Sequence, residues 1–333
     1  MKAGRSLSAI AAELERQVET RKDYIAPTER LTMVAREDKA VVLDGLNGEG
    51  MGIRPYAHRQ IADEAGIPGK YYERMRTAAP ALLAQNVNHW LHAEPSRRLV
   101  RTLDGDVRAF LSDRYRPIDS VDLAEATLPT LRDRGCQIVS AELTETRLYI
   151  KATLPSLQME VQGSRRVGDI AQAGIVISNS EVGAGSVRIE PLVYLLHCLN
   201  GAIVPDSSLK KYHIGLIADL EAGVREMLTT ETRRADDRAF WMKVRDVVKA
   251  SFERDVFARI IARMSESTQH PIVSHDLVKV VEVTGTKFGL SEGIGKSVLR
   301  HLSEGGDLSQ WGLSNAITRA SQDVEDYDEA TNL

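Results

Sequence analysis

The chain has 333 residues, of which 43% are hydrophobic and 27% are charged, and its formal net charge at pH 7 is -4. This composition is ordinary for a soluble globular protein of two or three domains, and it argues against a wholly basic protein that coats nucleic acid. The two cysteines are too few for a disulfide framework, and no Cys/His group has zinc-ligand spacing. No stretch is long and apolar enough to span a bilayer, so we expect a cytoplasmic protein without a membrane partner.

The hydrophobic pattern divides the chain into three regions and predicts an α+β fold. Residues 1–95 are expected to form a helical N-terminal region, with one short extended segment at 40–55. Residues 96–205 show short alternating runs and glycine-rich turns, which are typical of a β-hairpin-rich central sheet. Residues 206–333 return to helical spacing and predict a helical C-terminal region.

The stretch RQIADEAGIPGKYYERM, residues 59–75, has apolar residues at helical spacing on both sides of a glycine. Ile61 and Ala65 precede Gly66, which suits a left-handed turn, and Met75 continues the apolar stripe. We expect two helices around this turn, packed on their own core.

The same two helices could instead form a helix-turn-helix that enters a DNA groove. The second helix offers Lys70 and Arg74 as long cations, but Glu73 between them has the opposite sign. A duplex-DNA-binding regulator that uses these two cations therefore remains an alternative function.

The segment SRRLVRTLDGDVRAFLSDRYRP, residues 96–117, predicts a β-hairpin around Asp104-Gly105, a dipeptide that suits a type I′ turn. The resulting register places Arg101 opposite Arg108. An apolar core side is then shared by Val100, Thr102, Val107, Ala109 and Leu111.

The opposite side of that hairpin would hold two facing arginines beside Phe110. Like charges directly across a hairpin are destabilising unless something neutralises them. Nucleic-acid phosphate could do so, with the ring stacking on a base, and so could a carboxylate from elsewhere in the fold. The sequence leaves both open, and we expect removal of Arg101 alone to leave the fold intact.

A second β segment, QIVSAELTETRLYIKATLP at 137–155, repeats this arrangement. Arg147, Tyr149 and Lys151 alternate with apolar residues, so one face of the strand is basic and aromatic. This face could follow a nucleic-acid strand, or Glu142 could neutralise Arg147 and leave an ordinary surface.

The third segment, GIVISNSEVGAGSVRIEPLVYLLHCLNG at 174–201, predicts a buried strand, a loop of small residues and a short strand that carries Arg188. A helix is expected to begin near Pro191. Backbone N–H groups in the loop could hold an oxyanion, although a simple tight turn uses the same residues.

Signals for an enzyme are weak. The stretch GLSEGIGKS is out of register with a nucleotide-binding P-loop, and no nucleophile motif is present. Four glutamates could converge on Mg²⁺ in a metal-dependent nuclease, a further alternative: Glu142, Glu145, Glu181 and Glu190. We expect no cofactor, no metal and no catalytic turnover.

The stretch DVEDYDEA, residues 323–330, carries five acidic residues and no base. We interpret it as a solvated helix end. An acidic segment of this kind can also compete with nucleic acid for a basic groove.

Several stretches resemble a phage/plasmid-like family catalogued as domain of unknown function 932. They are RAFLSDRYRPIDSVDLAEATLPTL, ELTETRLYIKATLP, ISNSEVGAGSVRIEPLVYLLHCLNG, LSQWGLSNAITRASQDVEDYDEA, RQIADEAGIPGKYYERM and LLAQNVNHWL, which are spread over residues 59–330. The resemblance implies a protein of a mobile genetic element and supplies no catalytic residues.

Together these features predict a protein that binds nucleic acid, most simply single-stranded DNA, to assist recombination, annealing or replication. A homo-oligomer could align its hairpins along one strand. The predicted contact residues are Arg97, Arg98, Arg101, Arg108, Phe110, Arg114, Arg147, Tyr149, Lys151 and Arg188.

Overall fold

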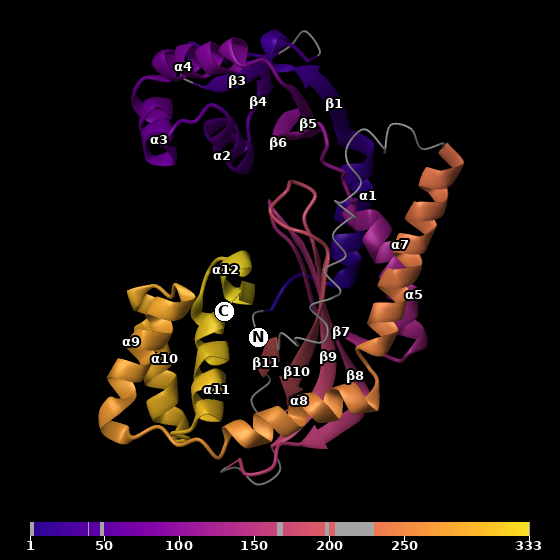
Figure 1. The fold of residues 1–333 in the computed structure, drawn as a ribbon, viewed down its shortest axis with the longest axis vertical. Helices are drawn as coiled ribbons and strands as arrows, with labels where there is room; N and C mark the ends of the chain where they lie inside the picture. Colours follow the sequence, from indigo (N-terminus) through magenta and orange to yellow (C-terminus); the bar gives the residue numbers. More distant parts are fainter. Residues whose placement is uncertain are drawn as a thin grey trace.

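The computed structural model describes residues 3–38, 40–46, 50–164, 169–196, 200–203 and 230–332. Its architecture is α+β, as predicted, with helices toward both ends and antiparallel sheets between them. Figure 1 shows a first lobe of mixed strands and helices, a central sheet flanked by long helices, and a C-terminal helical bundle.

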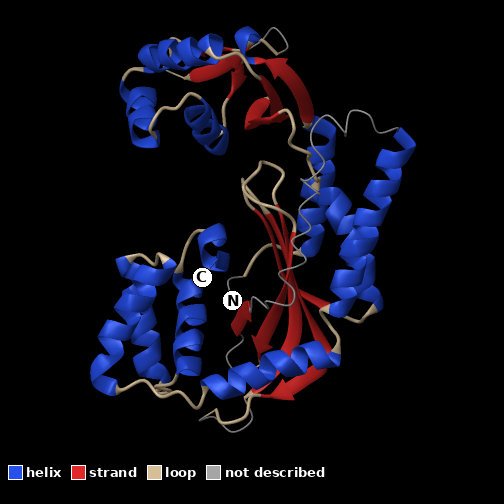
Figure 2. Ribbon diagram, viewed as in Figure 1, coloured by secondary structure: helices blue, strands red, loops and turns tan. Residues whose placement is uncertain are grey.

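The first lobe contains more strand than predicted. Its elements are β1 (Lys22–Pro27), η1 (Thr28–Arg30), β2 (Thr32–Ala35), β3 (Val41–Asp44), β4 (Met51–Gly52), α2 (Pro55–Glu64), α3 (Gly69–Ala78), α4 (Pro80–Ala93), β5 (Arg97–Leu103) and β6 (Asp106–Ser112). They form two three-stranded sheets, β1-β5-β6 and β2-β3-β4, with helices packed on them (Figure 2). Proline at the first position of α2 and of α4 is compatible with a helix start, because the first N–H groups have no helical acceptor.

The hairpin β5–β6 belongs to the core of this lobe. Val100, Val107 and Phe110 pack with Ile61 of α2 and Leu83 of α4 in one buried cluster. The predicted boundary at residue 95 therefore does not separate two cores, because the strands after it complete the core that the preceding helices begin.

The central sheet has the strand order β11-β10-β9-β8-β7, and every neighbouring pair is antiparallel. Its strands are β7 (Gln137–Leu143), β8 (Leu148–Glu160), β9 (Ile170–Asn179), β10 (Arg188–Leu195) and β11 (Asn200–Ile203). One apolar core joins this sheet to α1 (Leu7–Thr20), α5 (Ser120–Asp133), α7 (Thr230–Ala250) and α8 (Arg254–Ser267), and Trp311 from the C-terminal bundle also packs in it. Because α5 lies inside region 96–205, that region is less purely β than predicted.

The helix predicted near Pro191 is absent from the described residues, since Pro191 lies within β10 opposite Ile175. On the other side of β10, the pairing with β11 that the described residues show begins at Leu192. A strand can accept proline where one side has no partner, because the missing N–H then removes no ladder bond.

The C-terminal bundle contains η3 (Ser274–Asp276), α9 (Leu277–Phe288), α10 (Glu292–Gly305), α11 (Gln310–Ala320), η4 (Ser321–Asp323) and α12 (Tyr327–Asn332). Val298 and Leu302 of α10 pack with Ala316 of α11 in its core, and α11 lies against β11. Helical structure in the predicted region 206–333 is confirmed from residue 230 onward, and residues 204–229 lie outside the described residues. No helix in the described ranges is long and apolar enough to cross a bilayer.

Candidate nucleic-acid interface

The predicted turn of the β5–β6 hairpin is confirmed, and so is the pairing of Thr102 with Val107, but the predicted register is wrong from Arg101 onward. Asp104 and Gly105 have φ angles of 57° and 83°, as a type I′ turn requires, and Thr102 lies opposite Val107. The register then shifts, because Arg101 pairs with Ala109 and leaves Arg108 as an extra residue in a β-bulge. Arg101 and Arg108 therefore do not face each other.

The bulge also exchanges the residues on the two faces of β6. Phe110 lies opposite Val100 and packs in the core of the first lobe. Leu99, Ala109 and Leu111 instead pack against Val182 in the loop after β9. Both faces of the hairpin are thus covered, so Phe110 is not the exposed stacking ring that the sequence predicted.

Arg101 is 1% exposed and is surrounded by acceptors. Its guanidinium donates to Asp23 at 2.8 Å, to Asp119 at 2.9 Å and to the backbone oxygen of Glu181 at 2.9 Å. Of the two partners that the sequence left open for this arginine, the structure shows the carboxylate.

Arg108 is also buried, and it donates to a carboxylate oxygen of Glu181. The other oxygen of Glu181 accepts from the backbone N–H of Ser120 at 2.6 Å. Burial acts to raise the pKa of Glu181, but the Arg108 guanidinium and the Ser120 N–H outweigh it and hold that pKa below its usual range. The two arginines join the first lobe to the central sheet.

The loop of small residues after β9 mainly presents hydrogen-bond acceptors to the junction between the first lobe and the central sheet. The backbone oxygen of Ser180 accepts from the Tyr115 hydroxyl, and that of Val182 accepts from the Gln60 side chain. The backbone oxygen of Ala184 accepts from the Arg147 guanidinium. The Ser180 hydroxyl accepts the N–H of Ala184 at 2.9 Å. The tight-turn interpretation agrees with these contacts better than an oxyanion site does, because carbonyl oxygens repel anions.

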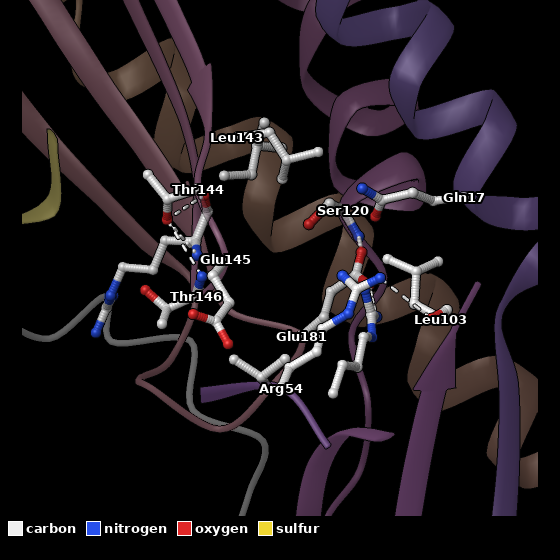
Figure 3. A pocket seen from close by; sticks show the side chains of 13 residues that line it. Gln17, Arg54, Leu103, Ser120, Leu143, Thr144, Glu145, Thr146 and Glu181 are labelled. Carbon is white, nitrogen blue, oxygen red and sulfur yellow. Dashed lines mark hydrogen bonds and ion pairs between the residues drawn. The ribbon is translucent and has the colours of Figure 1, made fainter. Parts of the chain in front are cut away.

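A small cavity of about 40 Å³ lies beside the junction (Figure 3). Figure 3 shows Thr144, Glu145 and Thr146 on one side of it and Ser120 and Glu181 on the other. One water molecule needs about 10–15 Å³ of such a cavity, so this cavity has room for a few waters and is too small for a nucleotide.

The four glutamates do not converge on a metal position. Glu142 pairs with Arg5 at 2.7 Å, and Glu145 accepts from the backbone N–H of Tyr56 at 2.9 Å. Within the described residues no three His, Cys, Asp or Glu side chains form a group that could hold a metal ion. The sequence could not decide this point, because these glutamates are brought near other groups only by strand pairing and loop packing.

The basic and aromatic face of β8 lies under α12. Tyr149 and Lys151 are both 3% exposed, and Arg147 is half-buried. The prediction of an exposed face is therefore wrong for two of the three residues, because α12 and a packed neighbouring strand cover them. Arg188 lies on this same face, since Tyr149 pairs with Ser178 and Ser178 pairs with Arg188.

Three predicted contacts lie at the end of the hairpin away from its turn. Arg97 and Arg114 are exposed, and in the described structure their side chains form no ion pair. Arg98 pairs with Glu64. Only Arg97 and Arg114 of the ten predicted residues combine full exposure with an uncompensated charge.

The predicted helix pair α2–α3 forms around a turn at Gly66, which has φ of 64°. Ile61, Ala65 and Met75 are buried, as predicted, and so is Tyr72. The opposite face of α3 is exposed, and its Lys70 and Arg74 make no ion pair with any described residue.

Tyr71 is a further exposed residue of α3, with 47% of its surface accessible. It follows Lys70 directly in α3, beside the edge of the buried Tyr72 and Met75 face. Helical spacing alone could not separate the two tyrosines, because residue 71 is four positions from Met75 and residue 72 is three, and both spacings put side chains on neighbouring parts of a helix face.

Comparison with protein-family models, with curated proteins and with solved structures finds no match to this chain. The resemblance to the phage/plasmid-like family thus stays a prediction from the sequence. Any function must be argued from the geometry above.

Proposed function

We propose that the protein binds duplex DNA through the outer face of α3. The observation that supports this proposal is that Tyr72 and Met75 fix α3 from one side, while Lys70 and Arg74 are exposed on the other side and Tyr71 is exposed next to them. In helix-turn-helix proteins the second helix enters the major groove, and cations next to it hold the phosphates.

The acidic residue that weakened this interpretation in the sequence is compensated. Glu73 pairs with Arg76 at 2.7 Å one turn further along α3. Lys70 and Arg74 therefore add net positive charge to the exposed face. The turn is also well defined, since the Ile67 N–H donates to the Ala62 oxygen at 2.9 Å across Gly66.

The single-stranded DNA hypothesis loses its main support, because it rested on the hairpin face of Arg101, Arg108 and Phe110. All three side chains are buried, and both arginines are paired with carboxylates. A nucleic acid could reach them only if the junction opened.

The test is a titration of a labelled 20-base-pair duplex at two salt concentrations, with the parent and the variant Lys70→Gln/Arg74→Gln. Each phosphate contact that is lost should lower the salt slope by about one unit, so we expect the slope to fall by about two and affinity at low salt to fall at least tenfold. The control Arg259→Gln/Lys279→Gln removes the same charges from exposed positions on α8 and α9.

Equal losses in both variants would show that only net charge matters and would contradict a role for α3. Single-stranded DNA and RNA of the same sequence complete the experiment. Tighter binding of either one than of the duplex would contradict the duplex assignment.

A further inference from the structure

We infer that the face of β8 beneath α12 is a second surface for nucleic acid, specific for a single strand, and that the acidic helix α12 covers it until α12 is released. This inference goes beyond the proposed function, because it concerns a different lobe and a different form of nucleic acid.

The covered face has the residue types that bind single strands. Tyr149 and Lys151 lie on it at alternate positions of β8, about 6.6 Å apart, Arg188 of β10 shares it, and Arg147 directly precedes β8. Cations can hold phosphates along such a track while the ring stacks on a base. Two acidic residues also lie on this face by strand pairing, Glu142 and Glu190, and Arg5 neutralises Glu142.

Among the residues that the structure describes, two of the cations have no carboxylate partner. The Lys151 ammonium is buried, and its contacts are the Thr331 hydroxyl at 3.0 Å and the Tyr327 ring at 4.6 Å. The side chain of Arg188 makes no hydrogen bond or ion pair with any described residue, and its Nε atom is buried without a partner. A buried charge without a counter-ion is costly, and a phosphate would supply one.

Burial also lowers the pKa of Lys151 to about 8. The ammonium is thus still mostly protonated at neutral pH while no carboxylate balances it. The covered state is strained electrostatically, and release of α12 would relieve that strain.

The cover is small and acidic. α12 has six residues, and hydrogen bonds of three of its side chains, Tyr327, Asp328 and Thr331, join it to the central sheet and the loop before β8. Asp328 accepts from Thr146 at 2.6 Å and from Thr144 at 3.0 Å, and the Tyr327 hydroxyl lies 2.8 Å from that of Ser140. Figure 1 shows α12 at the end of the bundle that faces the central sheet. An acidic segment on a cationic face can compete with a nucleic-acid strand for it.

The test uses the full chain with Tyr327→Ala/Asp328→Asn, which removes two of the three anchors. Glu329→Gln is the matched control, because it removes one negative charge from an exposed position of the same helix. Two quantities are measured in each protein. The first is the rate at which an amine-reactive acylating reagent modifies Lys151, with the modified site identified by mass spectrometry. The second is the affinity for labelled oligo(dT).

We expect the double variant to acylate faster at Lys151 and to bind oligo(dT) about tenfold more tightly, an increase of the size that one stacked base provides. The control should match the parent in both measurements. Adding Lys151→Gln to the double variant should remove most of the gain in affinity.

Unchanged acylation in the double variant would show that α12 is not a removable cover. Faster acylation without tighter oligo(dT) binding would show that the uncovered face does not bind single strands. Either result overturns the inference. The Lys70→Gln/Arg74→Gln variant tests the proposed function separately, since it leaves this face unchanged.

Discussion

The Arg108 guanidinium donates to the Glu181 carboxylate across the boundary between the first lobe and the central sheet. Arg108 is the bulged residue of β6, and Glu181 lies in the loop that follows β9. The second oxygen of Glu181 accepts from the first residue of α5, Ser120. One buried pair thus connects three segments that are distant in the sequence.

Removal of one member of this pair should be strongly destabilising. Arg108→Ala leaves the Glu181 carboxylate buried without its cation, and such changes cost about 3–5 kcal/mol. Urea unfolding of Arg108→Ala measures the loss. As a control, Asp133→Asn breaks the exposed pair with Arg132 and should cost about 1 kcal/mol or less. A loss in Arg108→Ala no larger than in the control would show that the pair does not hold the lobes together.

The structure reverses the expectation that Arg101 can be removed without harm. Arg101→Ala deprives Asp23 and Asp119 of a buried partner, although Asp119 keeps Arg21 at 2.8 Å. We expect a loss of about 2–4 kcal/mol in the free energy of unfolding. Arg97→Ala, on the exposed start of the same strand, should stay within about 0.5 kcal/mol of the parent. Equal stability of the two variants would contradict the network.

Substitution of two glycines in the helix pair distinguishes the effect of backbone strain on stability from the effect of side-chain packing. An added Cβ meets nothing within 4 Å at Gly66 or at Gly69, but only Gly66 has a left-handed φ, of 64°. Gly66→Ala should therefore destabilise by about 1 kcal/mol, and Gly69→Ala should be neutral or slightly stabilising. Thermal unfolding distinguishes them. A loss at Gly69 as large as at Gly66 would contradict the turn.

Acid should weaken the first lobe through His58. The imidazole is buried and lies 2.8 Å from the Tyr72 hydroxyl, and burial lowers its pKa from 6.5 to about 4, with Arg76 adding to the effect. Because the unfolded state then binds the proton more readily, stability present above pH 6.5 is lost as the pH falls toward 4, by up to about 3 kcal/mol.

Urea unfolding between pH 7 and 4.5 checks this expectation. His58→Gln removes the titrating ring and should lose less stability over this range than the parent. His275→Gln, at an exposed position, should follow the parent. If His58→Gln also follows the parent, His58 is not the source of the pH dependence.

Local chemistry determined the parts that the sequence predicted correctly. Asp104-Gly105 forms its turn because two neighbouring residues must accept positive φ, and α2–α3 forms because apolar residues recur at helical spacing around Gly66. These preferences act over a few neighbouring residues, so they can be recognised in the sequence alone. The α+β class follows from the same short-range patterns.

Only the tertiary structure decided what each face contacts. The bulge at Arg108 moves one residue out of register, and this shift sends Phe110 into the core and turns Leu111 toward Val182. The carboxylates that pair with Arg101 and the helix that covers Lys151 come from distant segments. Burial and charge pairing depend on which segments meet in space, and the alternation of residues along a single strand does not contain that information.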